Sequence, residues 1–151
     1  PSNSKSSNNQ SATAKDKTLL IFSRNLENPW GRAAGGRHMF AMDTDGNGYE
    51  LDRTVDGLKQ VYKYSPDEME QYLKKWNGQI NGYLTVQVNS KLFNEAFRYL
   101  DITRSGYKYR VSKQNSNAFI RDLVSMSGGT MPNDEGFGCV PGGKEDFWHY
   151  C

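Results

Sequence analysis

The sequence predicts one α+β domain in which an antiparallel sheet packs against about three helices. Short β-prone runs surround an Asp-Gly and Asn-Gly cluster, the strongest short-range signal for a hairpin. Three other segments carry apolar residues at helical spacing behind capping residues. Aromatic residues make up 13% of the 151 residues, and their rings pack well on sheet faces.

A polar leader precedes the predicted domain. Residues 1–17 consist almost wholly of Ser, Asn, Lys, Thr and Ala, which offer too little apolar surface to offset chain entropy. We interpret 1–17 as a flexible polar linker and 18–151 as a single compact domain, which is long enough to bury a core. Because the chain begins with Pro1 rather than Met, we expect that it was cut from a longer exported protein.

Runs of strand length recur along the chain, and they cover residues 18–22, 38–43, 49–51, 82–88 and 106–112. The second and third runs flank the Asp-Gly and Asn-Gly cluster, so they are predicted to form a hairpin. Side chains alternate along a strand, so we expect His38 and Phe40 on one face and Met39 on the other.

Three helices are predicted from caps and periodicity. Residues 65–68 (SPDE) supply an N-cap, a proline at the first helical position and a glutamate three residues after the cap. A second helix is expected to be capped near Ser90. The third follows Asn115-Ser116-Asn117 and stops at Gly128-Gly129, which puts Ser116 at a helix N-terminus.

Charge and cysteine content limit the classes of partner. Lys and Arg number 19 against 17 Asp and Glu, and the basic residues are scattered, so no nucleic-acid partner is predicted. No stretch approaches the ~20 consecutive apolar residues of a membrane helix. The stretch after residue 129 has an irregular pattern and holds Cys139 and Cys151. Their spacing is compatible with a short disulfide and equally with two free thiols.

The sequence pattern argues against two kinds of metal site, a calcium loop and a zinc site. The segment DTDGNG (43–48) resembles the start of a calcium loop, but the twelfth position is Thr54, which cannot supply the closing bidentate carboxylate. The pattern therefore favours a hairpin turn. The chain has only two histidines, His38 and His149, and no His or Cys pair at ligand spacing other than the late cysteines, so no metal or cofactor is predicted.

His38 is the strongest candidate catalytic residue. A lone histidine on a strand is usually structural, but a glycine-rich segment leads to His38, and the strand after the hairpin returns Glu50 and Asp52. Either carboxylate would orient an imidazole. Ser116 is the candidate nucleophile, because a helix N-terminus presents amides and a partial positive charge. The simpler interpretation is that residues 115–117 only cap the helix.

The pieces GGRHMFAMD, YELD, YKYRV and NSNAFIRDLVSMSGG, spread over residues 36–129, resemble the circularly permuted papain-like group. That group includes bacterial cell-wall peptidases and lecithin:retinol acyltransferase-like enzymes. The resemblance implies a permuted papain-like sheet and an acyl-transfer site, and we assign Asn115 and Asn117 to substrate binding. The nucleophile of the group is cysteine, whereas this chain has Ser116, which must lose its proton as it attacks.

The segment NSN followed by Phe119 and an apolar helix, with a later Pro141-Gly142, also resembles C-terminal domains of Rhs-type and other polymorphic bacterial toxins. This second resemblance implies a secreted effector that acts in bacterial competition. It further implies delivery into a target cell and a cognate immunity protein as partner.

The leading hypothesis is a hydrolase or acyltransferase that acts on an amide or ester bond. In it Ser116 attacks, His38 is the general base and then acid, and helix amides hold the oxyanion. The implied substrate is a peptidoglycan peptide, a lipid or a protein side chain. An alternative is a catalytically inactive papain-like module that binds glycan or peptide through Tyr and Trp. A nuclease or ADP-ribosyltransferase is less favoured, because no paired metal carboxylates or phosphate cradle stands out.

Overall fold

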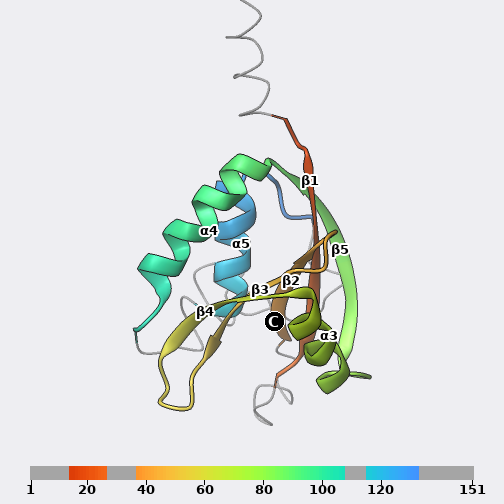
Figure 1. The fold of residues 1–151 in the computed structure, drawn as a ribbon, viewed down its shortest axis with the longest axis vertical. Coiled ribbons are helices and arrows are strands. Elements are labelled where there is room, and N and C mark those ends of the chain that lie inside the picture. Colours follow the sequence, from red (N-terminus) through yellow and green to blue (C-terminus); the bar gives the residue numbers. More distant parts are fainter. Residues whose placement is uncertain (1–13, 27–36, 108–114, 133–151) are drawn as a thin grey trace, which may run out of the picture.

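The computed structural model describes residues 14–26, 37–107 and 115–132 (Figure 1). Within these ranges the chain forms five strands and three helices, in the order β1 (Lys17–Asn25), β2 (Arg37–Asp43), β3 (Gly48–Arg53), β4 (Lys59–Tyr64), α3 (Pro66–Lys75), β5 (Ile80–Val88), α4 (Ser90–Arg104) and α5 (Ser116–Met126). The predicted α+β class is confirmed.

The strands make one sheet in the order β4-β3-β2-β1-β5, and each neighbouring pair is antiparallel. Figure 1 shows α4 and α5 side by side, across the sheet from α3. The main core lies between the sheet and the α4–α5 pair, and its largest side chains include Leu19, Met39, Leu51, Phe93, Leu100 and Phe119. Phe40, one residue after Met39, instead contacts Phe22 of β1 and Tyr72 of α3. The predicted alternation along β2 is therefore confirmed.

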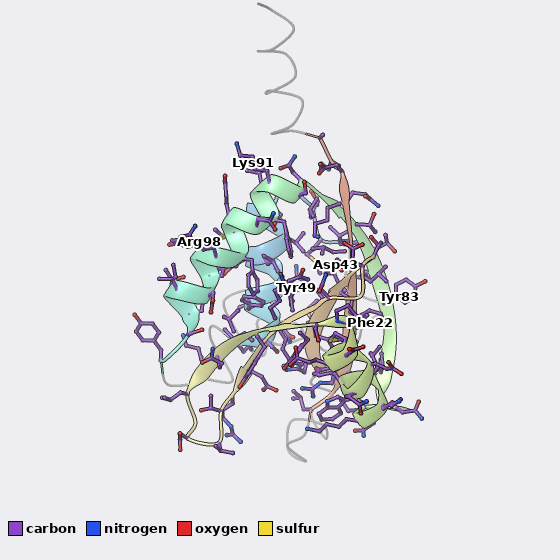
Figure 2. The ribbon with its side chains drawn as sticks, in the orientation of Figure 1. Phe22, Asp43, Tyr49, Tyr83, Lys91 and Arg98 are labelled. Carbon is purple, nitrogen blue, oxygen red and sulfur yellow. The ribbon has the colours of Figure 1, made fainter. Side chains whose placement is uncertain are left out.

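The turn between β2 and β3 is organised by Asp43, which confirms the predicted hairpin. Its carboxylate accepts hydrogen bonds from the backbone N–H groups of Asp45 and Asn47, each at 3.0 Å. It also accepts from the hydroxyl of Tyr49 at 2.8 Å, and Figure 2 shows these two side chains close together. Burial raises the pKa of Asp43, but the hydrogen bonds from Tyr49 and Asn47 outweigh burial and lower it.

Helix α3 begins as predicted. The side chain of Ser65 accepts from the backbone N–H of Glu68, and the Glu68 carboxylate accepts from the backbone N–H of Ser65. Met69 of this helix packs on the β2–β3 hairpin at Gly48, where an added Cβ would lie 2.1 Å from the Met69 sulfur. A side chain at position 48 would therefore force the Met69 side chain to move.

The other two helices also begin where the caps predicted. Asn89 caps α4, one residue before the expected Ser90, and accepts from the N–H of Leu92 at 2.9 Å. Asn115 caps α5, so Ser116 is the first residue of that helix. None of the helices in the described ranges is both long and apolar enough to cross a membrane.

Strand β4 was not predicted. Its sequence KQVYKY alternates, but two lysines interrupt the apolar pattern that marked the other strands. Val61 is nevertheless buried and opposite Leu51 of β3. Of the strand predicted at 106–112, Gly106 and Tyr107 form backbone hydrogen bonds with Lys59, at 2.8 and 2.6 Å, and residues 108–112 lie outside the described ranges.

The end of the predicted linker belongs to the fold. Lys17 begins β1 opposite Val88, and the carboxylate of Asp16 accepts from the N–H and the hydroxyl of Ser90, at 2.8 and 2.9 Å. An acidic group there stabilises the N-terminus of α4. The described fold thus starts before residue 18, the predicted boundary. Cys139, Cys151 and Pro141-Gly142 lie outside the described residues.

Candidate active site

His38 and Glu50 form a buried pair between neighbouring strands. Strands β2 and β3 are paired at Ala41–Tyr49 and Met42–Gly48, beside the hairpin. Further from the hairpin, His38 Nε2 lies 2.5 Å from Glu50 Oε1, and the two side chains are 3% and 1% exposed. The sequence left two carboxylates, Glu50 and Asp52, as candidates for orienting His38, and Glu50 is the one that contacts it.

Two tyrosine hydroxyls complete the environment of the Glu50 carboxylate. Tyr64 of β4 donates to Oε2 at 2.5 Å, and Tyr72 of α3 donates to Oε1 at 3.0 Å. Burial raises the pKa of Glu50, but the hydrogen bonds from His38 and Tyr64, together with the positive charge of Arg24, outweigh burial and lower it. Glu50 is therefore ionised at neutral pH.

Both hydroxyls remain protonated. Burial, followed by the negative charge of Glu50, raises the pKa of Tyr64 and of Tyr72 above the ordinary value. Each phenol therefore keeps its proton and acts as a hydrogen-bond donor to the carboxylate.

Asp52, the second candidate for orienting His38, is paired elsewhere. Its Oδ2 lies 3.5 Å from Arg24 Nη2, and its side chain is 39% exposed. Arg24 itself is buried, and its guanidinium lies 3.7 Å from the ring centroid of Trp76. Asp52 therefore acts on Arg24, and no hydrogen bond joins it to His38 within the described part of the chain.

A metal ion does not fit this cluster. One ligand atom each from His38, Glu50 and Asp52 lies within 4.8 Å of the others, a spacing that a cation could bridge. However, Arg24 Nη2 lies 3.8 Å from Glu50 and 3.5 Å from Asp52. The guanidinium already lies beside both carboxylates, and its positive charge would repel a cation held between them.

The start of α5 is fastened to the start of β2. Asn117 Oδ1 accepts from the backbone N–H of Met39 at 2.7 Å, and Asn117 Nδ2 donates to the carbonyl of Arg37 at 2.9 Å. One side chain thus binds the residues on both sides of His38. Asn115 Oδ1 accepts from the N–H groups of Asn117 and Ala118, at 3.0 and 3.1 Å. The hydrogen bonds described here give both asparagines structural roles, and the assignment to substrate binding stays a prediction.

Ser116 lies at this junction and is 2% exposed. Its hydroxyl donates to Asn117 Oδ1 at 3.3 Å, and no hydrogen bond joins it to His38 among the residues that the structure describes. The predicted oxyanion site, formed by backbone amides at the start of α5, loses two donors. The N–H groups of Asn117 and Ala118 already donate to Asn115 Oδ1. The backbone N–H of Ser116 itself is the first amide of the helix not bound by this cap.

Sequence reasoning missed Arg24, Tyr64 and Tyr72. Tyr64 belongs to the strand that was not predicted, and Tyr72 lies among the apolar residues at helical spacing that follow the Ser65 cap, so nothing marked its hydroxyl. A usable signal was present, since a tyrosine on the buried stripe of a helix needs a partner for its hydroxyl. The polar partner of Tyr72 was not identifiable, because it lies 22 residues away on another strand.

No protein-family model, curated protein sequence or solved structure matches this chain.

Proposed function

We propose that the domain is an acyl-transfer hydrolase of the permuted papain-like type, which uses Ser116 as nucleophile and His38 as general base. The observation that carries this proposal is the buried 2.5 Å contact between His38 Nε2 and Glu50. An ionised carboxylate only accepts hydrogen bonds, so Nε2 carries the imidazole proton. The other ring nitrogen, Nδ1, is then the basic one, which is the arrangement that a general base requires.

The position of Ser116 supports its role as nucleophile. Asn117, the next residue, binds the backbone of Arg37 and Met39, so the N-terminus of α5 adjoins the backbone of His38. The partial positive charge of a helix N-terminus stabilises the negative charge that develops on an attacking oxygen. Catalytic hydrogen bonds are often long without substrate and tighten in the complex, so Ser116 would exchange Asn117 Oδ1 for His38 Nδ1 on binding.

The reaction follows from these roles. The Ser116 oxygen bonds to the substrate carbonyl carbon while its proton passes to His38 Nδ1. The bond from that carbon to the leaving nitrogen or oxygen then breaks, and the leaving group takes the proton from His38. Water repeats the attack on the acyl-enzyme and releases the acid; an acceptor alcohol or amine in place of water would make the enzyme an acyltransferase.

The substrate class rests on the sequence resemblance. A peptidoglycan peptide, a lipid ester and a protein side chain each contain the required carbonyl. The resemblance to toxin C-terminal domains further suggests an effector delivered into a target cell, where a cognate immunity protein would bind it.

A fluorophosphonate probe tests the proposal, because it reacts with activated serines whatever the natural substrate is. After incubation of the folded protein, tandem mass spectrometry should locate the label on Ser116. His38→Gln should reduce labelling at least about tenfold, since general-base catalysis contributes at least that much. Ser90 is the internal control, because it is also the first residue of a helix, α4.

Two outcomes would contradict the proposed roles of His38 and Ser116. Labelling of Ser116 that survives His38→Gln would remove His38 from the mechanism. Absence of label on Ser116, in a protein that melts cooperatively, would contradict the hydrolase and favour the binding module.

A further inference from the structure

The hydroxyl of Tyr72 stands between Arg24 and Glu50. We propose that Tyr72 is a positioning residue that keeps Arg24 from hydrogen bonding to Glu50, reserves this carboxylate for His38 and so sets the imidazole tautomer. The catalytic meaning of this inference rests on the proposed function, but the tautomer is a property of the folded protein that can be measured without turnover.

The hydrogen bonds around Tyr72 have only one consistent direction. A phenol has one proton to donate and lone pairs to accept with. Arg24 Nε can only donate, and it lies 2.8 Å from the Tyr72 oxygen. The phenol proton is therefore left for Glu50 Oε1, at 3.0 Å. Hydrogen bonding thus runs from Arg24 through Tyr72 to Glu50.

Arg24 forms a long ion pair with Glu50 but no hydrogen bond. A guanidinium and a carboxylate prefer two parallel N–H···O bonds, but here the nearest contact, from Nη2 to Oε1, is 3.8 Å. The donors of Arg24 are directed elsewhere: Nε to Tyr72, Nη1 to the carbonyl of Asn25 at 3.1 Å and Nη2 to Asp52 at 3.5 Å. Stacking on Trp76 fixes the plane of the group.

This arrangement favours the hydrogen bond between His38 Nε2 and Glu50 Oε1. Glu50 Oε1 is shared only between the imidazole and the Tyr72 hydroxyl among the hydrogen bonds of the described residues. If the hydroxyl is removed, Arg24 Nε loses its acceptor, and the guanidinium, whose Nη2 already lies 3.8 Å from Glu50 Oε1, is free to turn and bond the carboxylate directly. That bond would compete with Nε2–H···Oε1, and the imidazole would then populate the Nδ1–H tautomer, in which Nδ1 is no longer basic.

Tyr64 offers a matched control. Its hydroxyl also donates to Glu50, to Oε2 at 2.5 Å, but it forms no hydrogen bond with Arg24. Tyr64→Phe and Tyr72→Phe therefore each remove one donor from the same carboxylate, and only the second releases the guanidinium.

The experiment is ¹⁵N NMR of the protein labelled at histidine, in a His149→Gln background so that one imidazole is observed. At a pH where the spectra show a neutral imidazole, the two nitrogen shifts report which nitrogen carries the proton. Wild-type protein and Tyr64→Phe should show the Nε2–H tautomer alone, and Tyr72→Phe a mixture of both. The double variant Tyr72→Phe with Arg24→Met should return to Nε2–H, because the competing guanidinium is gone.

Equal shifts in the two tyrosine variants, or a double variant that stays mixed, would overturn the inference. If Tyr72→Phe does not fold, Tyr72→Met, which also lacks the hydroxyl, replaces it, with Tyr64→Met as its matched control. An unchanged tautomer in folded Tyr72→Met would then contradict the inference. The expected tautomer pattern without fluorophosphonate labelling of Ser116 would instead refute the proposed function and leave the positioning role intact.

Discussion

Asn117 Oδ1 accepts a hydrogen bond from the backbone N–H of Met39, 78 residues earlier in the chain. With its second bond, to the carbonyl of Arg37, the side chain supplies β2 with the donor and the acceptor that a neighbouring strand would otherwise provide. Together with the apolar side chains of α5 in the core, this residue fixes the start of α5 beside the backbone of His38.

Asn117→Ala should therefore destabilise the domain by about 3 kcal/mol, because two buried backbone groups lose their partners. Urea unfolding followed by circular dichroism measures this. Asn117→Asp keeps the acceptor oxygen for Met39 and loses the donor to Arg37, so it should fall between wild type and Asn117→Ala. Unchanged stability in Asn117→Ala would show that water or another group satisfies β2.

Glu50 should make stability depend on pH on the acid side. Its pKa in the folded protein lies below the ordinary 4.5, so the folded state favours the ionised form. The resulting stability is fully present above about pH 4.5 and is lost as the pH falls through the lowered folded pKa. Glu50→Gln has no such group, so the stability difference between wild type and this variant should shrink on acidification. Glu70→Gln, on the exposed side of α3, is the control for the loss of a surface carboxylate.

The Asp43 turn should contribute to folding without a cation. Asp43→Ala removes the acceptor for two backbone amides and the Tyr49 hydroxyl, so we expect a loss of about 2 kcal/mol in urea unfolding. Asp45→Ala, in the same exposed turn, should cost much less. Addition of millimolar calcium should leave the melting temperature unchanged, because donors already surround the Asp43 carboxylate; a rise would reveal a calcium site.

Ser116→Cys should retain the candidate site and allow its reactivity to be measured by alkylation of the thiol. In a Cys139→Ser, Cys151→Ser background it carries the only thiol, and a thiol ionises more readily than an alcohol. Iodoacetamide should alkylate it faster than a free cysteine at pH 7, and His38→Gln should slow the reaction. Equal rates with and without His38 would show that the imidazole does not reach position 116.

Ser116→Ala and His38→Ala should be non-additive. If the two residues act as one unit, either variant should remove nearly all hydrolysis of an activated ester, and the double variant should remove little more. Far-UV spectra and cooperative melting establish that each variant is folded. Full activity in Ser116→Ala would leave the serine as a helix residue only.

The N-terminal boundary can be tested by truncation. A chain that begins at Ala14 keeps Asp16 against Ser90 and Lys17 in β1, so its melting temperature should match that of the full chain. A chain that begins at Thr18 loses both contacts and should melt at a lower temperature. Equal melting of the two truncated chains would restore the original boundary at residue 17.

Local signals in the sequence were sufficient for much of the fold. The hairpin at residues 43–48 and the capping box at Ser65 involve partners at most six residues apart, so residue types and spacing predict them directly. The N-terminus of α5 at Ser116 follows from the same kind of evidence. Strand β4 was missed because its burial comes from pairing with β3, and its own composition does not indicate burial.

The choice of partner for His38 required the tertiary structure. Glu50 and Asp52 lie two residues apart on one strand face, so no periodicity distinguishes them. The surroundings of Arg24 distinguish them, since Arg24 donates to Asp52 and to the Tyr72 hydroxyl, whereas Glu50 accepts from His38 and Tyr72. These contacts join β1, β3 and α3 across 22 to 48 residues of chain, and they depend on strand order and on which face a helix covers. Local residue patterns carry the information for turns, caps and helical stripes, whereas the protonation and pairing of a buried carboxylate depend on every charge and donor that packing brings within a few ångströms.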